Sequence, residues 1–467
     1  MGFKKKLHTL DPKKDKEREL KVCVTKERAK TIKVTASKNE TKVRELLSNK
    51  ISGVFVGLWL LVAEHLRLGT WDLIKSWTAC NDHDISPRIA MQIVNESALC
   101  VSGFRERHCL CNQGFEVLNG LSYVVSDEDV HLLLNKHTVQ DAIQMQENLC
   151  RLRLIAGHYK WNLLAIDPHR IITYSQRMMP KKRKTPEASP EKMLQTFFCI
   201  DAQTGQPLVH TLGSTGLSTT KATIALLEMI GNILPHQVLI LADKEHFSET
   251  LLVSIKDIPL FDAIVPTPQT SKVKGLAASL NYEKMWAGYA IAQTDYLFKG
   301  SKKPFFLLSE RIGEIPDKYF YKSFISTTNK DALKMLAEDY DQRWTIEEFF
   351  NFEGNLGWNR ASTMNLNIRY GKMSLALMAQ AANYQLRQKL PAPYKQWTAK
   401  SLADNLFRGM DGDIKVVDDT ILVTVYNAPK NLNLEQHYKN LPAKLMAENV
   451  DPHIPWLFGF KLNFLFK

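Results

Sequence analysis

The spacing of apolar and polar positions changes near residue 161, and this change divides the chain. Before it, apolar residues recur at helical spacing in the segments 43–47, 54–68, 87–100, 127–135 and 138–156. Ser86-Pro87 and Ser126 are typical of helix starts. We therefore expect residues 41–160 to be mostly helical.

After residue 161 the pattern favours strands. Short runs rich in β-branched and aromatic residues lie at 163–166, 171–174, 196–200, 208–212, 238–242 and 263–265. Helical spacing at 219–234 and 247–255 separates the later runs. Strands that alternate with helices in this way indicate an α/β sheet.

The remainder of the chain mixes both patterns. Residues 270–327 are rich in β-formers, notably at 289–291, 305–308 and 320–325. Helical spacing then returns at 330–352 and 373–390. Residues 414–426 predict a hairpin that turns at Asp418-Asp419. The sequence thus predicts four parts, at 1–40, 41–160, 161–372 (with an insertion at 270–327) and 373–467.

Net charge points to an anionic partner. The chain of 467 residues has a formal net charge of +12, and residues 1–50 hold 16 Lys or Arg against 7 Asp or Glu. Nucleic acid is the commonest partner of such a protein. The basic start, residues 1–40, is either a partly disordered, solvated tail or an arm that contacts phosphates, and both readings stay open.

Cysteine usage and hydropathy bear on the compartment. The seven cysteines have no disulfide-framework spacing, which favours a reducing cytoplasm. Cys109 and Cys111 lack the spacer of a structural zinc site. The apolar run 54–63 is too short to span a membrane, and no signal peptide is visible. We expect a soluble protein with no membrane partner.

Two aspartates follow apolar strand patterns. Asp167 follows the run 163–166, and Asp243 follows the run 238–242. An α/β sheet places ligands at the carboxyl ends of its strands, so two such residues on neighbouring strands can share a hard cation. An isolated Asp in this position is more often a turn former. Asp201 also ends a β-run, but it begins a turn-like segment, so we favour Asp167.

A third carboxylate has a basic and a phenolic companion. Tyr340, Arg343 and Glu347 point within about 60° of one another on an α-helix. Glu348 points some 100° away from Glu347. We therefore expect Asp167, Asp243 and Glu347 to bind Mg²⁺ or Mn²⁺, with two ions per active site as two-metal phosphoryl transfer requires.

Further residues near these positions are candidates for contacts with DNA. His169 shares a strand face with Asp167 if the strand continues, although most such histidines are ordinary strand residues. A loop flanked by prolines carries four consecutive basic residues, which are Lys181, Lys182, Arg183 and Lys184. Beside a cluster of aspartates, this loop is expected to contact phosphates; otherwise it is simply solvated.

The motif around residue 347 resembles that of bacterial insertion-sequence transposases with an Asp-Asp-Glu site, of the IS-four type. That family has Tyr, Arg, Glu and Lys at fixed spacing, and Tyr340, Arg343 and Glu347 match the first three. The Lys is missing, since position 354 is Gly and position 351 is Asn. Arg360 and Arg369 are the candidates for the basic contact to DNA that this Lys would make.

Other segments are similar to the same family. Ile166-Asp167-Pro-His169 resembles its first aspartate motif, and Ala242-Asp243-Lys-Glu245 resembles its second. Pro455-Trp456-Leu457 resembles a closing motif of some members. Some relatives wedge an aromatic side chain into the DNA end, and Trp286 is a candidate, although an aromatic residue in a β-rich segment is usually part of the core.

The resemblance implies a fold and a reaction. It implies an RNase H-like catalytic domain at 161–372 with a β-rich insertion at 270–327. A helical DNA-binding domain at 41–160 precedes it, and a C-terminal helical region with a small hairpin follows at 373–467. It also implies a transposase that cuts the ends of its element and joins the freed 3′-OH to target DNA, with Arg343 and Tyr340 holding phosphates.

The same resemblance implies partners and a location. The expected partner is double-stranded DNA, both the terminal repeats and the target, bound by a homodimer on paired DNA ends in the bacterial cytoplasm at the nucleoid. Two alternatives stay open: a metal-dependent DNA endonuclease on the same fold, and a domesticated DNA-binding protein that no longer catalyses. An ordinary nucleotide-binding enzyme is disfavoured because the chain lacks a Gly-rich phosphate loop.

Overall fold

Two compact units make up the chain. The computed structural model describes residues 38–53, 55–101, 106–107, 109–111, 114–183, 187–360 and 363–467. Residues 157–350 form one unit, and residues up to 156 form the other together with 351–467. Both units contain helices and strands, so this is a mixed α/β protein. Nearly all of the basic tail at 1–40 lies outside the described residues, and the four-part division stays a prediction.

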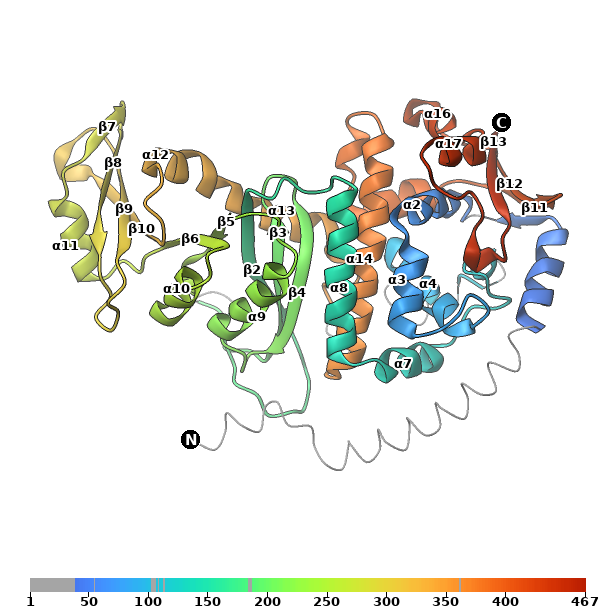
Figure 1. Ribbon diagram of the computed structural model, residues 1–467, viewed down its shortest axis with the longest axis horizontal. Coiled ribbons are helices and arrows are strands. Elements are labelled where there is room, and N and C mark those ends of the chain that lie inside the picture. The colour runs from blue at the N-terminus through green and yellow to red at the C-terminus, as the bar shows by residue number, and fades with distance from the viewer. Residues whose placement is uncertain are drawn as a thin grey trace. The chain divides into compact units, whose positions relative to one another are not determined.

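The unit 157–350 is built on a sheet whose first five strands are visible in Figure 1. They are β2 (Leu163–Ile172), β3 (Met193–Asp201), β4 (Gln206–Ser214), β5 (Val238–Ala242) and β6 (Phe261–Pro266). Their spatial order is β4-β3-β2-β5-β6. β2, β5 and β6 are parallel to one another, whereas β3 is antiparallel to both its neighbours. β3 and β5 are buried along their whole length, and β5 is a continuous apolar run of the kind found in buried parallel strands.

Two helices of this unit pack on the same sheet (Figure 1). α9 (Thr219–Gly231) packs against β3 and β4, and α10 (Glu249–Lys256) packs against β6 and α9. Each begins at a serine whose hydroxyl accepts a backbone N–H of the first turn, Ser218 for α9 and Ser248 for α10. The helices predicted at 219–234 and 247–255 are confirmed.

Four more strands extend the sheet beyond β6. They are β7 (Glu283–Trp286), β8 (Tyr289–Tyr296), β9 (Phe305–Ile312) and β10 (Phe320–Ser326), and the short helices of this segment are α11 (Ser271–Ser279) and η3 (Pro316–Lys318). β10 lies antiparallel to β6, and β9, β8 and β7 follow in order. The strands predicted between 270 and 327 are confirmed. Trp286 is 50% exposed and stacks on Tyr289, so it is not a core residue.

The predicted helix at 330–352 is helical throughout most of its length but is not one α-helix. Its pieces are α12 (Ala332–Lys334), the π-helical turn η4 (Met335–Asp339), the 3-10 segment η5 (Tyr340–Trp344) and α13 (Thr345–Glu353). The expectation of a regular helix is wrong in this middle part. π-turns inside helices are found frequently at functional sites.

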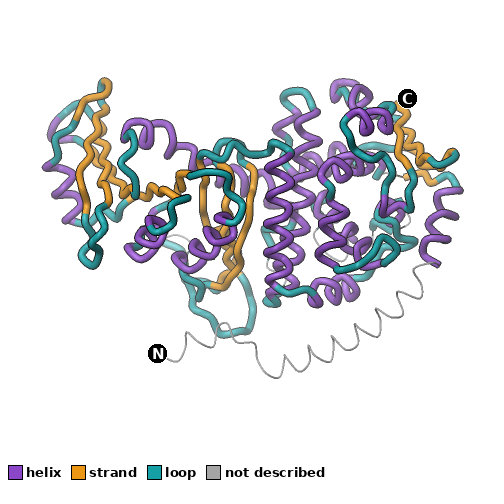
Figure 2. The backbone as a smooth tube through the Cα atoms, in the orientation of Figure 1, coloured by secondary structure: helices purple, strands orange, loops and turns teal. Residues whose placement is uncertain are grey.

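Helices dominate the unit formed by residues up to 156 and 351–467. Residues 38–48 are helical, and the elements that follow are η1 (Val56–Trp59), α2 (Leu60–Leu68), α3 (Thr70–Thr78), α4 (Ile85–Ala98), α6 (Phe115–Leu118), α7 (Asp127–Lys136), α8 (Val139–Ile155) and α14 (Leu366–Lys389). The long helix α14 lies beside α8 (Figure 2) and also packs against α2, α4 and α7. Ser126 and Thr138 cap α7 and α8. The helices predicted from residue 127 to 156 are confirmed.

The C-terminal part of this unit adds short elements and a second sheet. The short helical elements are η6 (Gly354–Leu356), η7 (Tyr394–Gln396), α15 (Ala399–Leu402), η8 (Ala403–Phe407), η9 (Lys430–Leu432), α16 (Leu434–Tyr438), α17 (Leu441–Ala447) and η10 (Pro455–Leu457). The sheet has the order β1 (Ile51–Gly53), β11 (Gly412–Val417), β12 (Thr420–Val425), β13 (Lys461–Phe466). The predicted hairpin is confirmed, with Asp418 at a positive φ of 55° in its turn. β1 and β13 were not predicted.

Across the part of the chain that the structure describes, no helix combines the length and the apolar composition needed to cross a membrane. Residues 56–63 of the apolar segment belong instead to η1 and α2, whose residues are largely buried.

Candidate active site

Strand register places Asp167 and Asp243 next to each other. β2 and β5 pair in parallel from Leu163 to Ile166 on β2, and the last pair is Ile166 with Ala242. Asp167 and Asp243 each follow that last pair directly. The two carboxylates therefore lie at the carboxyl end of the parallel pairing, where α/β sheets bind their ligands.

The predicted end of the first strand at Ile166 is wrong. β2 continues through Pro168 to Ile172 and merges with the strand predicted at 171–174. Beyond Ile166 it pairs with β3 alone, because β5 has ended at Ala242. Proline is tolerated at such an edge because it has no N–H to donate and no strand on the free side requires one. Asp167 thus lies within a strand whose one edge is open.

Asp167 lies in an unusual electrostatic setting. Burial, and after it the negative charge of Asp243, raise the pKa of its carboxyl group to about 7. The positive charges of Arg343 and Arg170 oppose this rise. Asp167 is therefore a desolvated carboxyl group beside a second one, an arrangement common at functional sites.

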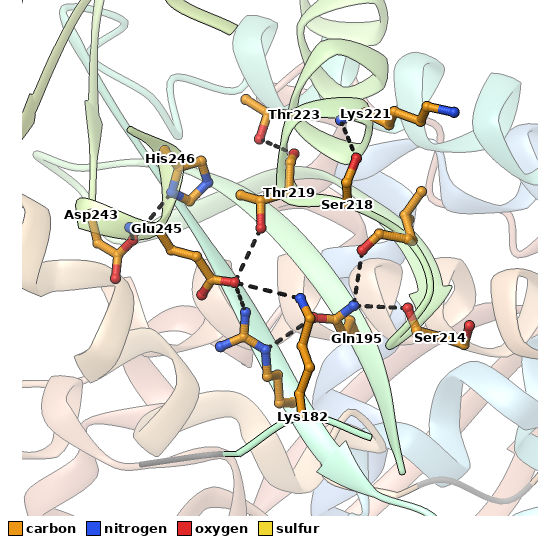
Figure 3. Close-up of polar contacts among 12 residues, drawn as sticks. Lys182, Gln195, Ser214, Ser218, Thr219, Lys221, Thr223, Asp243, Glu245 and His246 are labelled. Atoms are coloured by element: carbon orange, nitrogen blue, oxygen red, sulfur yellow. Dashed lines mark hydrogen bonds and ion pairs between the residues drawn. The ribbon is translucent and has the colours of Figure 1, made fainter. Parts of the chain in front are cut away.

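Asp243 is held by the turn that follows it (Figure 3). It caps the 3-10 turn η2 (Lys244–His246), and its Oδ1 accepts the backbone N–H of Glu245 at 2.6 Å. The Nδ1 atom of His246 lies 3.3 Å from the same oxygen. Burial alone would raise the pKa of Asp243, but His246 and the amide of Glu245 hold it below its ordinary value. Asp243 is thus the ionised member of the pair.

The helical segment with the Tyr-Arg-Glu motif lies at the end of β5. The hydroxyl of Tyr340 donates to the carbonyl of Ala242 at 3.2 Å, and its ring packs edge-on against Phe324. Burial raises the pKa of the Tyr340 phenol. The first contact of this hydroxyl is therefore the backbone next to Asp243, and its predicted contact with a phosphate stays a prediction.

Arg343 and Glu347 form a pair within this segment. Nη2 of Arg343 lies 3.1 Å from Oε1 of Glu347, and both charges act on Asp167. Burial works against the charged form of Arg343, yet Tyr340, Glu347 and Asp167 keep its pKa above the ordinary value. Phe349 and Phe350 of the same helix pack on Phe198, the residue opposite Asp167 on β3. The structure thus brings Arg343 and Glu347 to the aspartate pair.

The rival carboxylates lie in other surroundings. Asp201 is fully buried and accepts the backbone N–H groups of four residues, which are Lys160, Trp161, Gln203 and Thr204. These hydrogen bonds explain why the Asp201 carboxylate is buried, and no bound metal ion is needed to explain it. Glu348 is exposed, whereas Glu347 lies half-buried beside Arg343.

Of the predicted basic residues, Lys182 reaches the turn after β5. Its Nζ lies 3.9 Å from Oε1 of Glu245, and its backbone pairs with Glu191. Lys181 and Arg183 are exposed, and Lys184 lies outside the described residues. The ring of His169 lies 4.8 Å from that of Phe350, on the same side of β2 as Asp167. The proposed DNA contacts of these residues stay predictions.

Two charged residues of the site were missed in the sequence. Arg170, three residues after Asp167, donates to Glu245, two residues after Asp243. Both lie inside or beside the motifs quoted above, but nothing in the spacing of either motif links them across the 75 positions between them. In the other unit, Arg369 is buried on α14 and Arg360 is exposed, and neither is established as a substitute for the missing Lys.

The donor set suits a hard divalent cation, although no closed metal cage is present. Carboxylate oxygens are the preferred protein ligands of Mg²⁺, which is commonly bound by one or two of them. Asp167 and Asp243 supply such oxygens side by side, and the repulsion between them raises the pKa of Asp167. Among the described residues, no group of three His, Cys, Asp or Glu side chains is arranged to hold a metal ion. Glu347 pairs with Arg343 instead.

Comparisons with known proteins add little. No protein-family model and no curated protein sequence matches the chain. Among solved structures, the chain is similar to one described as a cryo-EM structure of the piggyBac transposase synaptic complex with hairpin DNA. The similarity covers 74% of this chain and 79% of that one, at 10% sequence identity and a TM-score of 0.39. At this level it supports no functional assignment, and the motif resemblance to the IS-four type stays a prediction.

Proposed function

We propose that this chain is a DNA transposase of an insertion sequence, which cuts the ends of its element and joins them to target DNA by phosphoryl transfer. The observation that carries the proposal is the placement of Asp167 and Asp243 immediately after the last β2–β5 pair, with Arg343 and Glu347 beside them. A carboxylate pair for a metal and a guanidinium for a phosphate are the parts that this chemistry needs.

The strand order supports the same proposal. In sequence order the strands β2 to β6 stand as 3-2-1-4-5, with the second strand antiparallel and the fourth and fifth parallel to the first. An α/β sheet of this kind suits the RNase H-like domain that the motif resemblance implies. The β-rich segment β7–β10 then precedes the helical segment with Glu347, also as expected.

Each residue of the site has a definable part in the proposed reaction. Asp167 and Asp243 would hold Mg²⁺ or Mn²⁺, two ions in the full scheme, with Glu347 as the third ligand. The bound ions supply an activated water and stabilise the leaving oxygen. Arg343 presents a planar guanidinium that can donate to a phosphate oxygen near the cut. Tyr340 fixes its helical segment to the end of β5 through the Ala242 carbonyl.

The remaining parts of the proposal concern partners. Lys181, Lys182 and Arg183 belong to a loop near the turn after β5, and the net charge of +12 suits a polyanion. The expected substrate is double-stranded DNA with the terminal repeats of the element, bound by two copies of the chain. A bacterial cytoplasm at the nucleoid is the setting in which this activity would operate.

The test is a cleavage and joining assay on duplex DNA that carries the repeats flanking the gene. We expect nicks at the repeat ends and joined products in Mg²⁺, both lost in Asp243→Ala and Glu347→Gln. Glu435→Gln is a matched control, because Glu435 is in an exposed ion pair with Lys439 far from any predicted site residue in sequence. Cleavage without joining would establish a nuclease instead. Tight, salt-sensitive binding without cleavage would leave a DNA-binding protein.

A further inference from the structure

An ion pair connects the two segments that carry the aspartates. Nη2 of Arg170, on the extension of β2 beyond Ile166, donates to Oε1 of Glu245, in the turn η2 after β5. The extension has no partner strand on this side, since β5 ends at Ala242. The turn after β5 therefore has one charged contact that ties it to β2 beyond the last backbone pair.

Glu245 is tied to Asp243 as well. Its backbone N–H donates to Oδ1 of Asp243 at 2.6 Å, while its side chain accepts from Arg170 (Figure 3). The same residue thus fixes the orientation of one aspartate and contacts the strand that holds the other. A shift of Glu245 would move the Asp243 carboxylate relative to Asp167.

Neutral side chains hold the ion pair from both ends. Nε of Arg170 donates to Oε1 of Gln195 at 3.0 Å, and Nε2 of Gln195 donates to the carbonyls of Ser214 and Leu217. On the other end, the hydroxyl of Thr219, in the first turn of α9, donates to Oε1 of Glu245 at 3.1 Å. Figure 3 shows Gln195, Thr219 and Glu245 as members of one connected set. Both charged groups are therefore held in place by neighbours on β3 and α9.

The stability of the fold does not account for this arrangement. The side chains of Arg170 and Glu245 are 17% and 31% exposed. A partly exposed ion pair typically contributes little to the free energy of unfolding. Nζ of Lys182 also lies 3.9 Å from Oε1 of Glu245, so this carboxylate has two cationic neighbours, Arg170 and Lys182. The contacts constrain position more than they add stability.

We propose that Arg170 and Glu245 are positioning residues that set the spacing of the Asp167 and Asp243 carboxylates and thereby the affinity of the site for a divalent cation. This inference rests on the proposed function. Partners behind metal ligands act in this way generally, and their loss typically lowers metal affinity about 10- to 100-fold. Neither residue is expected to contact the metal.

The test is a double-mutant cycle with a readout that does not need DNA. Mn²⁺ binding to the full chain is measured by isothermal titration calorimetry for the wild type, Glu245→Gln, Arg170→Gln and the double variant, with Glu435→Gln as the matched control. We expect each single variant to bind Mn²⁺ about 10- to 100-fold more weakly. We expect the double variant to be no weaker than either, because the two residues act through one contact.

A conservative variant protects the result against misfolding. Glu245→Asp keeps the charge but shortens the side chain, so we expect Mn²⁺ affinity between those of the wild type and Glu245→Gln. Melting temperatures of all variants should stay near that of the wild type, since the pair is partly exposed. If Glu245→Asp binds Mn²⁺ as weakly as Glu245→Gln while both variants are folded, the proposal is contradicted.

The outcomes separate this inference from the proposed function. Wild-type Mn²⁺ binding that is unchanged in Glu245→Gln, or losses in the two single variants that simply add, would overturn the positioning role and leave the transposase proposal standing. A wild-type chain that neither binds Mn²⁺ nor cleaves DNA would overturn both.

Discussion

Two carboxylate sites, one in each unit, show opposite ways of burying negative charge. Glu64, on α2, is fully buried, and both its carboxylate oxygens are neutralised. Its Oε1 accepts from the hydroxyl of Tyr438 at 2.6 Å and from Arg67 at 3.1 Å, and Oε2 pairs with Lys389. Within β2, just past its last pair with β5, Asp167 by contrast has a second carboxylate as its neighbour.

The difference distinguishes a carboxylate with a structural role, Glu64, from one with a proposed functional role, Asp167. Both oxygens of Glu64 have a donor, so its removal would leave Lys389 without its carboxylate and Arg67 with Glu448 alone. Asp167 loses solvation on burial and gains repulsion from Asp243, so the fold holds it at a cost. A site that is unfavourable for the free protein and favourable for a bound cation is typical of function.

The largest expected effect is on Asp167. Asp167→Asn should lower the rate of DNA cleavage by about 10³-fold or more, because a neutral amide replaces a negatively charged metal ligand. The melting temperature should stay equal or rise, since the change removes repulsion between neighbouring carboxylates. Cleavage assays and differential scanning fluorimetry on the same preparation measure both. A fall in melting temperature of several degrees would place Asp167 in the same structural class as Glu64.

Glu64 should behave in the opposite way. Glu64→Leu removes the carboxylate that pairs with Lys389 and one of the two carboxylates that pair with Arg67, and breaking a buried pair of this kind costs up to about 3–5 kcal/mol. We expect a marked fall in melting temperature with cleavage per folded molecule unchanged. The double variant Glu64→Leu/Lys389→Met should recover part of the loss, because apolar replacements of a buried pair are tolerated. No recovery, or no initial loss, would contradict the comparison.

The buried polar groups beside Glu64 should also give this unit a pH dependence. Burial lowers the pKa of His65 to about 4 from 6.5, and its Nδ1 faces the hydroxyl of Thr70. Above pH 6.5 the imidazole is neutral in the folded and the unfolded chain. As pH falls from 6.5 towards 4, only the unfolded chain binds the proton, so stability falls, by at most roughly 3 kcal/mol. Melting temperatures at pH 7 and pH 5 should differ less in His65→Gln than in the wild type.

The smallest effect concerns an exposed charge near the functional site. Lys181 is exposed and belongs to the basic loop. If Lys181 contacts a phosphate, the negative slope of log affinity against log salt concentration should become shallower by about 0.9 in Lys181→Gln. Fluorescence anisotropy with a terminal-repeat duplex at several salt concentrations measures the slope. An unchanged slope would remove Lys181 from the DNA contacts while leaving the carboxylate comparison intact.

Local patterns in the sequence predicted most elements of the fold. The apolar run before Asp243 and the helix capped by Ser126 form as predicted because burial and capping are encoded within a few residues. β1, with three residues, and β13 were missed because each becomes a strand through pairing with a distant segment, β11 or β12. Such pairing between distant segments leaves little trace in periodicity.

The adjacent placement of Asp167 and Asp243 was predictable, but the contacts around them were not. Asp167 and Asp243 could be found because each follows an apolar run. The continuation of β2 through Pro168 was missed, since proline ordinarily ends a strand and the free edge that permits it is visible only in the sheet. The pairing of Glu347 with Arg343 was also missed, because spacing brings residues onto one face without fixing their partners.

The most direct test of the central claim is to locate a bound cation. Crystals of the protein soaked in Mn²⁺ would be measured for anomalous scattering. The carboxylate pair predicts an anomalous peak within coordination distance, about 2.0–2.3 Å, of oxygens of both Asp167 and Asp243, and its loss in Asp243→Asn. A map without a peak at this position, with both carboxylates engaged by protein donors as Glu64 is, would contradict the account.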